Sequence, residues 1–180
     1  MKVGTDGVLL GAWCPVENHP FSVLDIGAGT GVLSLMLAQR SHAEQIDAIE
    51  IDEDAYEQCV DNFESSPWGD RLFCFHAGLD EFMDEPEDQY DIIISNPPFY
   101  SEDYKTDSEQ RNLARFQDAL PFEDLVEAAH LLLSENGIFA VIIPFKEEGK
   151  FISIAKDFDL HPFKITRVKG TPTTEIKRSL

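Results

Sequence analysis

The sequence predicts an α/β fold in which a mostly parallel central sheet carries helices on both faces. Short runs of β-branched and aromatic residues alternate with segments whose apolar residues recur at helical spacing, and this alternation implies crossover connections between parallel strands. The chain has 180 residues and shows no linker, internal repeat or low-complexity stretch. Hydrophobic residues make up 43% and charged residues 27%, as is ordinary for a globular protein. We therefore expect residues 1–180 to form a single domain.

The first half of the chain contains three predicted strands. They are short and rich in β-branched or aromatic residues, at 21–26, 45–51 and 71–76. A helix over 32–40 follows the first strand, because its apolar residues recur at helical spacing. A second helix ends near residue 64, and Asp52 or Asp54 can cap its first turn. Strand and helix thus alternate from the start.

The second half of the chain continues this alternation. Strands are predicted at 90–95, 138–143 and 163–168. Helices are predicted between them, at 122–134 and 147–158. Asn136 and Gly137 are expected to end the first of these helices. The longest irregular stretch, 97–121, follows directly after a strand apolar enough to be buried on both faces. In an open α/β sheet this is where a substrate loop belongs.

A glycine-rich segment joins the first predicted strand to the first predicted helix. It reads Asp25-Ile-Gly-Ala-Gly-Thr-Gly31, so that glycines stand at Gly27, Gly29 and Gly31. Glycines at such a junction let the backbone turn tightly and approach a ligand closely. The triphosphate-binding loop has a different glycine spacing and contains a lysine, which this segment lacks. The segment therefore favours a nucleotide-like cofactor over a nucleoside triphosphate, although a glycine turn without a ligand is the alternative.

An acidic residue ends the second predicted strand. Glu50 lies 19 residues after Gly31, where a carboxylate can accept both ribose hydroxyls of a nucleotide-like cofactor. Asp52 is the alternative, but it is better placed as a helix cap. We therefore expect Glu50 to contact the ribose.

The segment Asn96-Pro-Pro-Phe99 follows the strand predicted at 90–95. Two prolines fix the backbone and remove two amide donors, so that the carbonyls of the turn remain as acceptors. With the side-chain carbonyl of Asn96, they can accept both hydrogens of a planar primary amine. Phe99 offers a flat face for stacking a base or an amide. The alternative is a proline turn without a ligand. The position of the segment directly after a buried strand disfavours this alternative.

Several motifs together resemble a known family. DIGAGTG at 25–31, IEID at 49–52 and SNPPF at 95–99 resemble class I S-adenosylmethionine-dependent methyltransferases of the amino-group type. KVGTDGVLLGAW at 2–13 and RNLAR at 111–115 resemble, more narrowly, the bacterial tRNA(Val) adenine-N6-methyltransferases. The resemblance implies a Rossmann-like fold, S-adenosyl-L-methionine as cofactor, and methylation of the adenine beside the anticodon. Members of that family extend further at both ends, beyond a strand expected at 177–180, so we expect the chain to be clipped at both termini.

The resemblance also assigns roles to residues. The expected catalytic residues, which hold and align the amine, are Asn96, Pro97 and Phe99. Those expected to hold the cofactor are Asp25, Gly27, Gly29, Gly31, Glu50 and Asp80. Those expected to contact the substrate are Pro98, Lys2, Asp6, Arg111 and Arg115. Asp80 enters as a shifted substitute, because Gly78 occupies the position at which the family carries an acid against the cofactor adenine.

The charge of the chain bears on its partner. The formal net charge is −20, which is unusual for a protein that binds a phosphate backbone. Residues 146–180, however, hold eight basic and five acidic side chains, a net charge of +3, which leaves −23 for the rest. We expect tRNA to be bound weakly, through a few local cations. The alternatives are a glutamine-N5 methyltransferase that acts on a release factor and a non-catalytic module that binds S-adenosylmethionine.

Other classes of site find little support in the sequence. The three cysteines show no C-x-x-C spacing and the five histidines form no H-x-x-x-H pair, so no metal is expected. No apolar run approaches the length of a membrane span, and no signal peptide is evident. We expect a cytoplasmic monomer.

Overall fold

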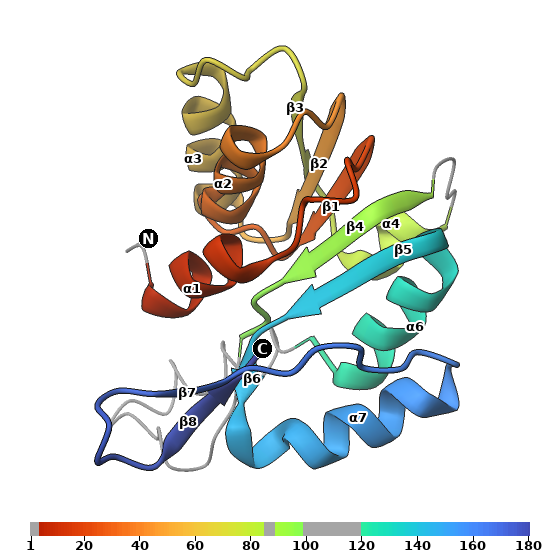
Figure 1. Ribbon diagram of the computed structural model, residues 1–180. Helices are drawn as coiled ribbons and strands as arrows, with labels where there is room; N and C mark the ends of the chain where they lie inside the picture. Colours follow the sequence, from red (N-terminus) through yellow and green to blue (C-terminus); the bar gives the residue numbers. More distant parts are fainter. Residues whose placement is uncertain (1–3, 85–88, 99–119) are drawn as a thin grey trace, which may run out of the picture.

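The computed structural model describes residues 4–84, 89–98 and 120–180, and its centre is a five-stranded sheet (Figure 1). The strands are β1 (Ser22–Ile26), β2 (Gln45–Glu50), β3 (Leu72–His76), β4 (Tyr90–Ser95) and β5 (Leu133–Val141). Their order is β3-β2-β1-β4-β5, and every neighbouring pair is parallel. The predicted α/β fold with a mostly parallel sheet is therefore confirmed.

Helices cover both faces of this sheet. They are α1 (Thr5–Trp13), α2 (Val32–Arg40), α3 (Glu53–Glu64), α4 (Leu79–Met83), α6 (Phe122–Leu132) and α7 (Glu148–Asp157). On one face α1, α2 and α3 share a core cluster that contains Leu10, Leu37 and Cys59. On the other face α4 and α6 pack over the sheet around Leu24 and Leu125, and α7 packs against α6 (Figure 1). Every residue of β1 is buried, as a strand covered on both faces requires.

The expected end of α6 is wrong. The helix ends at Leu132, and Asn136 and Gly137 lie inside β5 instead of after the helix. The β4–β5 register shifts between Tyr90 and Ile92, so that residues 134–137 form an irregular part of the ladder. A Cβ at Gly137 would stand 2.9 Å from the carbonyl oxygen of Tyr90. Because Gly137 has no side chain, it allows β4 and β5 to approach closely, and it does not cap a helix.

A small antiparallel sheet follows the central one along the chain. It consists of β6 (Ile143–Pro144), β7 (Arg167–Lys169) and β8 (Ile176–Ser179), in the order β6-β8-β7. The strand predicted at 163–168 is shorter and begins later, whereas the strand expected at 177–180 is present as β8. The 3₁₀ turn η2 (Phe145–Glu147) connects β6 to α7. Within the described parts of the chain, no helix is long and apolar enough to cross a membrane.

Candidate active site

A cavity of about 1030 Å³ opens where β1, β2 and β4 end. Residues from the loops after these strands line it, together with residues of α1, α4 and α6. The strand order reverses between β1 and its two neighbours β2 and β4, and open α/β sheets bind ligands at such a point. The cavity is large enough for a nucleoside-sized ligand.

The glycine loop forms one wall of this cavity. Gly27, Gly29 and Gly31 have φ angles of 72°, 59° and 76°, a left-handed backbone that glycine adopts without steric cost. Gly27 and Gly29 line the cavity, and a Cβ at Gly27 would meet no atom within 4 Å. The loop thus presents open backbone, as the close approach of a ligand requires.

Gly31 has a different function from the other two glycines. It is not among the residues that line the cavity. A Cβ at this position would clash with the ring of Phe63 and stand 2.7 Å from Sγ of Cys59. Gly31 therefore allows α2 to begin close against α3, and its expected contact with the cofactor stays a prediction.

Glu50 joins two loops at the cavity wall. Its side chain is 8% exposed and lines the cavity. One carboxylate oxygen accepts a hydrogen bond of 2.6 Å from the backbone N–H of Gly29, and the other accepts one of 2.9 Å from Asp52. Each oxygen retains lone pairs for a further donor. Asp52 caps α3, since its Oδ1 accepts from Ala55 N–H at 2.9 Å, so the predicted cap is confirmed.

Asp25 lies beneath the glycine loop. It is fully buried and is not among the residues that line the cavity. Its Oδ2 accepts hydrogen bonds from the backbone N–H and the hydroxyl of Ser34, at 3.1 and 2.7 Å. Among the described residues, Oδ1 has no hydrogen-bond partner. The observed contacts hold the start of α2 under the loop, and the expected contact of Asp25 with the cofactor stays a prediction.

Burial makes the stability of the fold depend on the ionisation of Asp25. Desolvation, with a smaller contribution from the negative charge of Glu50, raises the pKa of Asp25 from 3.8 to about 7, against the opposing hydrogen bonds from Ser34. Between these values the folded protein holds a proton that the unfolded chain has released, so the free energy of unfolding falls as the pH rises.

Asp25→Asn should remove this pH dependence. The free energy of unfolding of the variant minus that of the parent should be about 1–3 kcal/mol larger at pH 8 than at pH 5. Urea unfolding of both proteins at the two pH values measures the difference. A difference that is the same at both pH values would show that Asp25 titrates as an ordinary carboxyl group.

The segment after β4 forms another wall of the same cavity. Asn96, Pro97 and Pro98 all line it. The hydroxyl of Ser95 donates to the carbonyl oxygen of Ile26 at 2.8 Å, which fixes the end of β4 beside the end of β1. The structure thus brings the proline turn and the glycine loop to one cavity, although they are about 70 residues apart in sequence.

Helix α1 closes the cavity near Asn96, through two glycines to which the sequence analysis assigned no role. Gly4 and Gly7 line the cavity. A Cβ at Gly7 would stand 3.4 Å from Cγ1 of Val32 and 3.8 Å from the amide nitrogen of Asn96. Gly7 belongs to the KVGTDG segment, so the motif itself was the available signal.

The described cavity lining is acidic. It contains five carboxylates and neither lysine nor arginine; the acids are Glu50, Asp52, Asp80, Asp124 and Glu127. Asp80 is exposed in α4, and its Oδ1 would stand 2.7 Å from a Cβ on Gly78. Asp124 and Glu127 come from α6 and were not predicted, because the analysis of that helix concerned only its apolar face. Such a lining favours a cationic ligand and disfavours phosphate.

The remaining predicted site residues lie elsewhere. Asp6 is not among the residues that line the cavity, and its Oδ2 pairs with Nε of Arg178 at 2.7 Å. Its contact with the substrate stays a prediction. The other predicted substrate contacts and one catalytic residue lie outside the described residues; they are Lys2, Phe99, Arg111 and Arg115.

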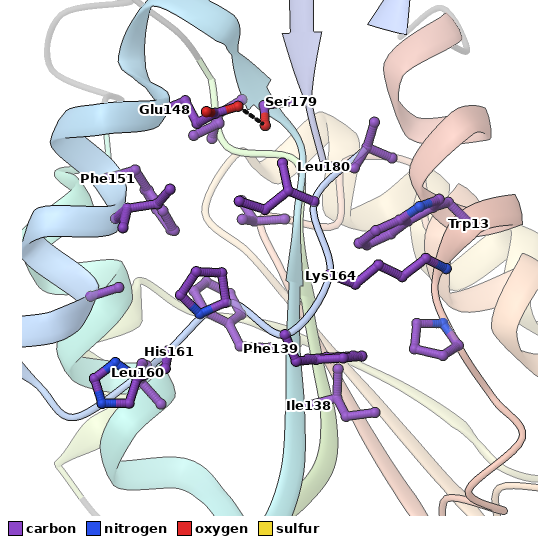
Figure 2. Close-up of a pocket in the computed structure, with 18 of the residues that line it drawn as sticks. Trp13, Ile138, Phe139, Glu148, Phe151, Leu160, His161, Lys164, Ser179 and Leu180 are labelled. Atoms are coloured by element: carbon purple, nitrogen blue, oxygen red, sulfur yellow. Dashed lines mark hydrogen bonds between the residues drawn. The ribbon is translucent and has the colours of Figure 1, made fainter. Parts of the chain in front are cut away.

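A second cavity, of about 430 Å³, contains none of the predicted site residues (Figure 2). It lies between β5, α7 and the chain before β7, and most of its walls are apolar, with Phe139, Phe151 and Leu160 among them. In the described parts of the chain, no three histidine, cysteine or acidic side chains gather as a metal site. The larger cavity is therefore the candidate active site.

The residues of the larger cavity fit S-adenosylmethionine. Gly27 leaves room that a side chain would fill, and Glu50 offers acceptors to ribose hydroxyls. The carboxylates of the lining suit the positive charges of the sulfonium and the ammonium group.

Comparisons with known proteins agree with this geometry. The family described as "Methyltransferase small domain" matches residues 13–159. A tRNA1(Val) (adenine(37)-N6)-methyltransferase of Flavobacterium johnsoniae is 79% identical, over 100% of this chain and 77% of that protein. A protein of the same name from Flavobacterium psychrophilum is 73% identical over the same shares. The crystal structure of a methyltransferase from Pyrococcus furiosus has the same fold, with a TM-score of 0.60 and 22% identity over 88% of this chain and 72% of that one.

Proposed function

The chain belongs to the methyltransferase small domain family and to the family of tRNA1(Val) (adenine(37)-N6)-methyltransferases, and we propose that its substrate is an adenine in tRNA. The protein is an S-adenosylmethionine-dependent N-methyltransferase, as the motifs implied. The relatives are named for adenine 37 of a valine tRNA, and we extend this target to the present chain. The observation that carries the proposal is the shared cavity of the glycine loop and the proline turn.

The cofactor half of the proposed site consists of the glycine loop and Glu50. When bound, S-adenosylmethionine supplies a methyl group on a sulfonium, which is already a strong electrophile. Gly27 and Gly29 leave the backbone open to the ligand, and Glu50 accepts hydrogen bonds from the ribose. We assign Asp80 to the adenine ring of the cofactor, since it lines the same cavity at the start of α4.

The substrate half of the proposed site consists of the turn after β4. The side-chain oxygen of Asn96 and the carbonyl oxygen of Pro97 accept the two N–H groups of the adenine amine. These acceptors orient the nitrogen and stabilise the positive charge that develops on it during transfer. The amine then loses a proton to solvent, so the chain needs no general base. Stacking on Phe99 remains a prediction from the sequence.

The proposal is tested with labelled cofactor and two candidate acceptors. Unmodified tRNA and an unmodified release factor are incubated separately with the protein and S-adenosylmethionine that carries a labelled methyl group. We expect the label in tRNA, because a base in the single-stranded anticodon loop can be unstacked at a low cost in free energy. A tRNA first exhausted with unlabelled cofactor is the control and should accept no label. Label in the release factor alone would replace this proposal with glutamine methylation.

A further inference from the structure

Among the residues that the structure describes, the lining of the proposed site offers no cation to a tRNA backbone. The described lining of the cavity carries five carboxylates and no basic side chain. Half or more of the hydrogen bonds between proteins and nucleic acids go to phosphate or sugar, chiefly from basic and hydroxyl side chains. Within the described parts of the chain, cations for the phosphates around the target adenine must therefore lie next to the cavity and not in its lining.

The hairpin of β7 and β8 is tied to the helix that closes the cavity. Arg178 in β8 pairs with Asp6 in α1 at 2.7 Å, one residue from the lining residue Gly7. At the other end of α1, the indole N–H of Trp13 donates to the hydroxyl of Thr166 at 2.9 Å. Figure 1 shows the hairpin at the end of the molecule toward which the arrows of β1, β4 and β5 point. The hairpin is therefore fixed to α1 next to a residue that lines the cavity.

The base of the hairpin is held in place. Glu148, at the start of α7, accepts from Arg167 in β7 at 2.7 and 3.0 Å. The same carboxylate accepts from the hydroxyl of Ser179 in β8 at 2.7 Å (Figure 2). At the tip, Thr171 N–H donates to the hydroxyl of Thr174 at 3.0 Å. One carboxylate thus joins both strands, and the tip is closed by its own hydrogen bonds.

Two lysines of the hairpin are available to a ligand. Lys169 and Lys177 are exposed, and neither forms an ion pair with any described residue. They flank the tip, where Thr171 and Thr173 are also exposed and carry hydroxyl groups. The two arginines of the hairpin are already paired with Glu148 and Asp6, so they position the hairpin rather than supply its unpaired charge.

We propose that the β7–β8 hairpin binds the phosphate backbone of the tRNA, through Lys169 and Lys177, while the target adenine occupies the cavity. The proposal rests on the function proposed above. It explains how a chain of net charge −20 binds a polyanion: the acidic cavity serves the cationic cofactor, and a separate basic hairpin serves the RNA.

The test compares two double variants of equal charge. Lys169→Ala with Lys177→Ala removes the proposed contacts, whereas Lys150→Ala with Lys156→Ala removes two positive charges from α7, where Lys150 pairs with Glu123. Affinity for unmodified tRNA is measured over a salt series. The hairpin variant should bind about tenfold more weakly at low salt, with a salt slope reduced by about 1–2 units, since each phosphate contact contributes about 0.7–0.9. The α7 variant should keep the parent affinity and slope.

Three further measurements separate a binding role from a structural one. The hairpin variant should raise KM for tRNA with little change in kcat, and its affinity for S-adenosylmethionine should equal that of the parent. Lys169→Arg with Lys177→Arg should restore tRNA affinity, because arginine also binds phosphate. The proposal would be overturned by equal losses of tRNA affinity in the two alanine variants. It would also be overturned if the arginine variant bound tRNA as weakly as the hairpin alanine variant. A parent that binds S-adenosylmethionine but neither binds nor methylates tRNA would instead overturn the proposed function.

Discussion

Asn96→Ala is expected to lower turnover about a hundredfold or more, the scale of losing one preorganised polar contact to a developing charge. Asn96 lines the cavity at the end of β4, beside Pro97 and Pro98. Alanine removes the side-chain acceptor and leaves the backbone carbonyls of the turn. Affinity for S-adenosylmethionine should remain that of the parent, because in the account above the cofactor is held by the glycine loop and Glu50.

The matched control for this change is Asn136→Ala. Asn136 is an exposed asparagine in β5 that lines the second cavity, so the same atoms are removed away from the proposed site. Steady-state turnover with tRNA and calorimetry with the cofactor are measured on both variants. Near-normal turnover of Asn96→Ala would show that the turn after β4 does not hold the amine.

Glu50→Ala is expected to weaken S-adenosylmethionine binding by about 1.5–3 kcal/mol, as for the loss of hydrogen bonds to a charged group. The change removes acceptors proposed for the ribose. It also releases the N–H groups of Gly29 and Asp52, which the carboxylate holds at 2.6 and 2.9 Å. The glycine loop therefore loses part of its support as well as a ligand contact.

Glu53→Ala is the control for this second change, because Glu53 is an exposed carboxylate in the first turn of α3 and does not line the cavity. Calorimetry gives the cofactor affinity of both variants, and urea unfolding shows whether each is folded. An unchanged affinity in folded Glu50→Ala would remove Glu50 from the site.

Sequence periodicity predicted the central sheet well because each strand carries its own signal. The run 90–95 is mostly apolar, with three consecutive isoleucines, and β4 (Tyr90–Ser95) has those bounds. The helix over 32–40 likewise coincides with α2. The end of α6 was wrong because Asn136 and Gly137 are typical of helix ends, while their actual place depends on a strand pairing with Tyr90. Strand and helix periodicity was therefore reliable, whereas this helix boundary was decided by a distant partner.

The same distinction applies to the candidate site. The motifs identified Gly27, Gly29, Glu50 and Asn96, and the structure places all four on one cavity. Asp25 belongs to the same motif but points away from the cavity, toward Ser34, which only the packing of β1 against α2 decides.

Individual side-chain contacts between distant parts of the chain could not be predicted. Asp6 pairs with Arg178, 172 positions away, and no local sequence pattern predicts such a contact. Gly31 resembles the other two glycines in sequence, yet it faces Phe63 and Cys59. The acids that α6 adds to the cavity were hidden for a similar reason, because a polar helix face is ordinarily solvated.

The identity of the methylated atom tests the central claim most directly. Unmodified tRNA is incubated with the protein and S-adenosylmethionine, digested to nucleosides, and analysed by mass spectrometry against synthetic methylated nucleosides. We expect N6-methyladenosine in reactions with the parent protein and at least a hundredfold slower formation with Asn96→Ala. Methylation of any other atom of the tRNA, or an equal rate in the two proteins, would contradict it.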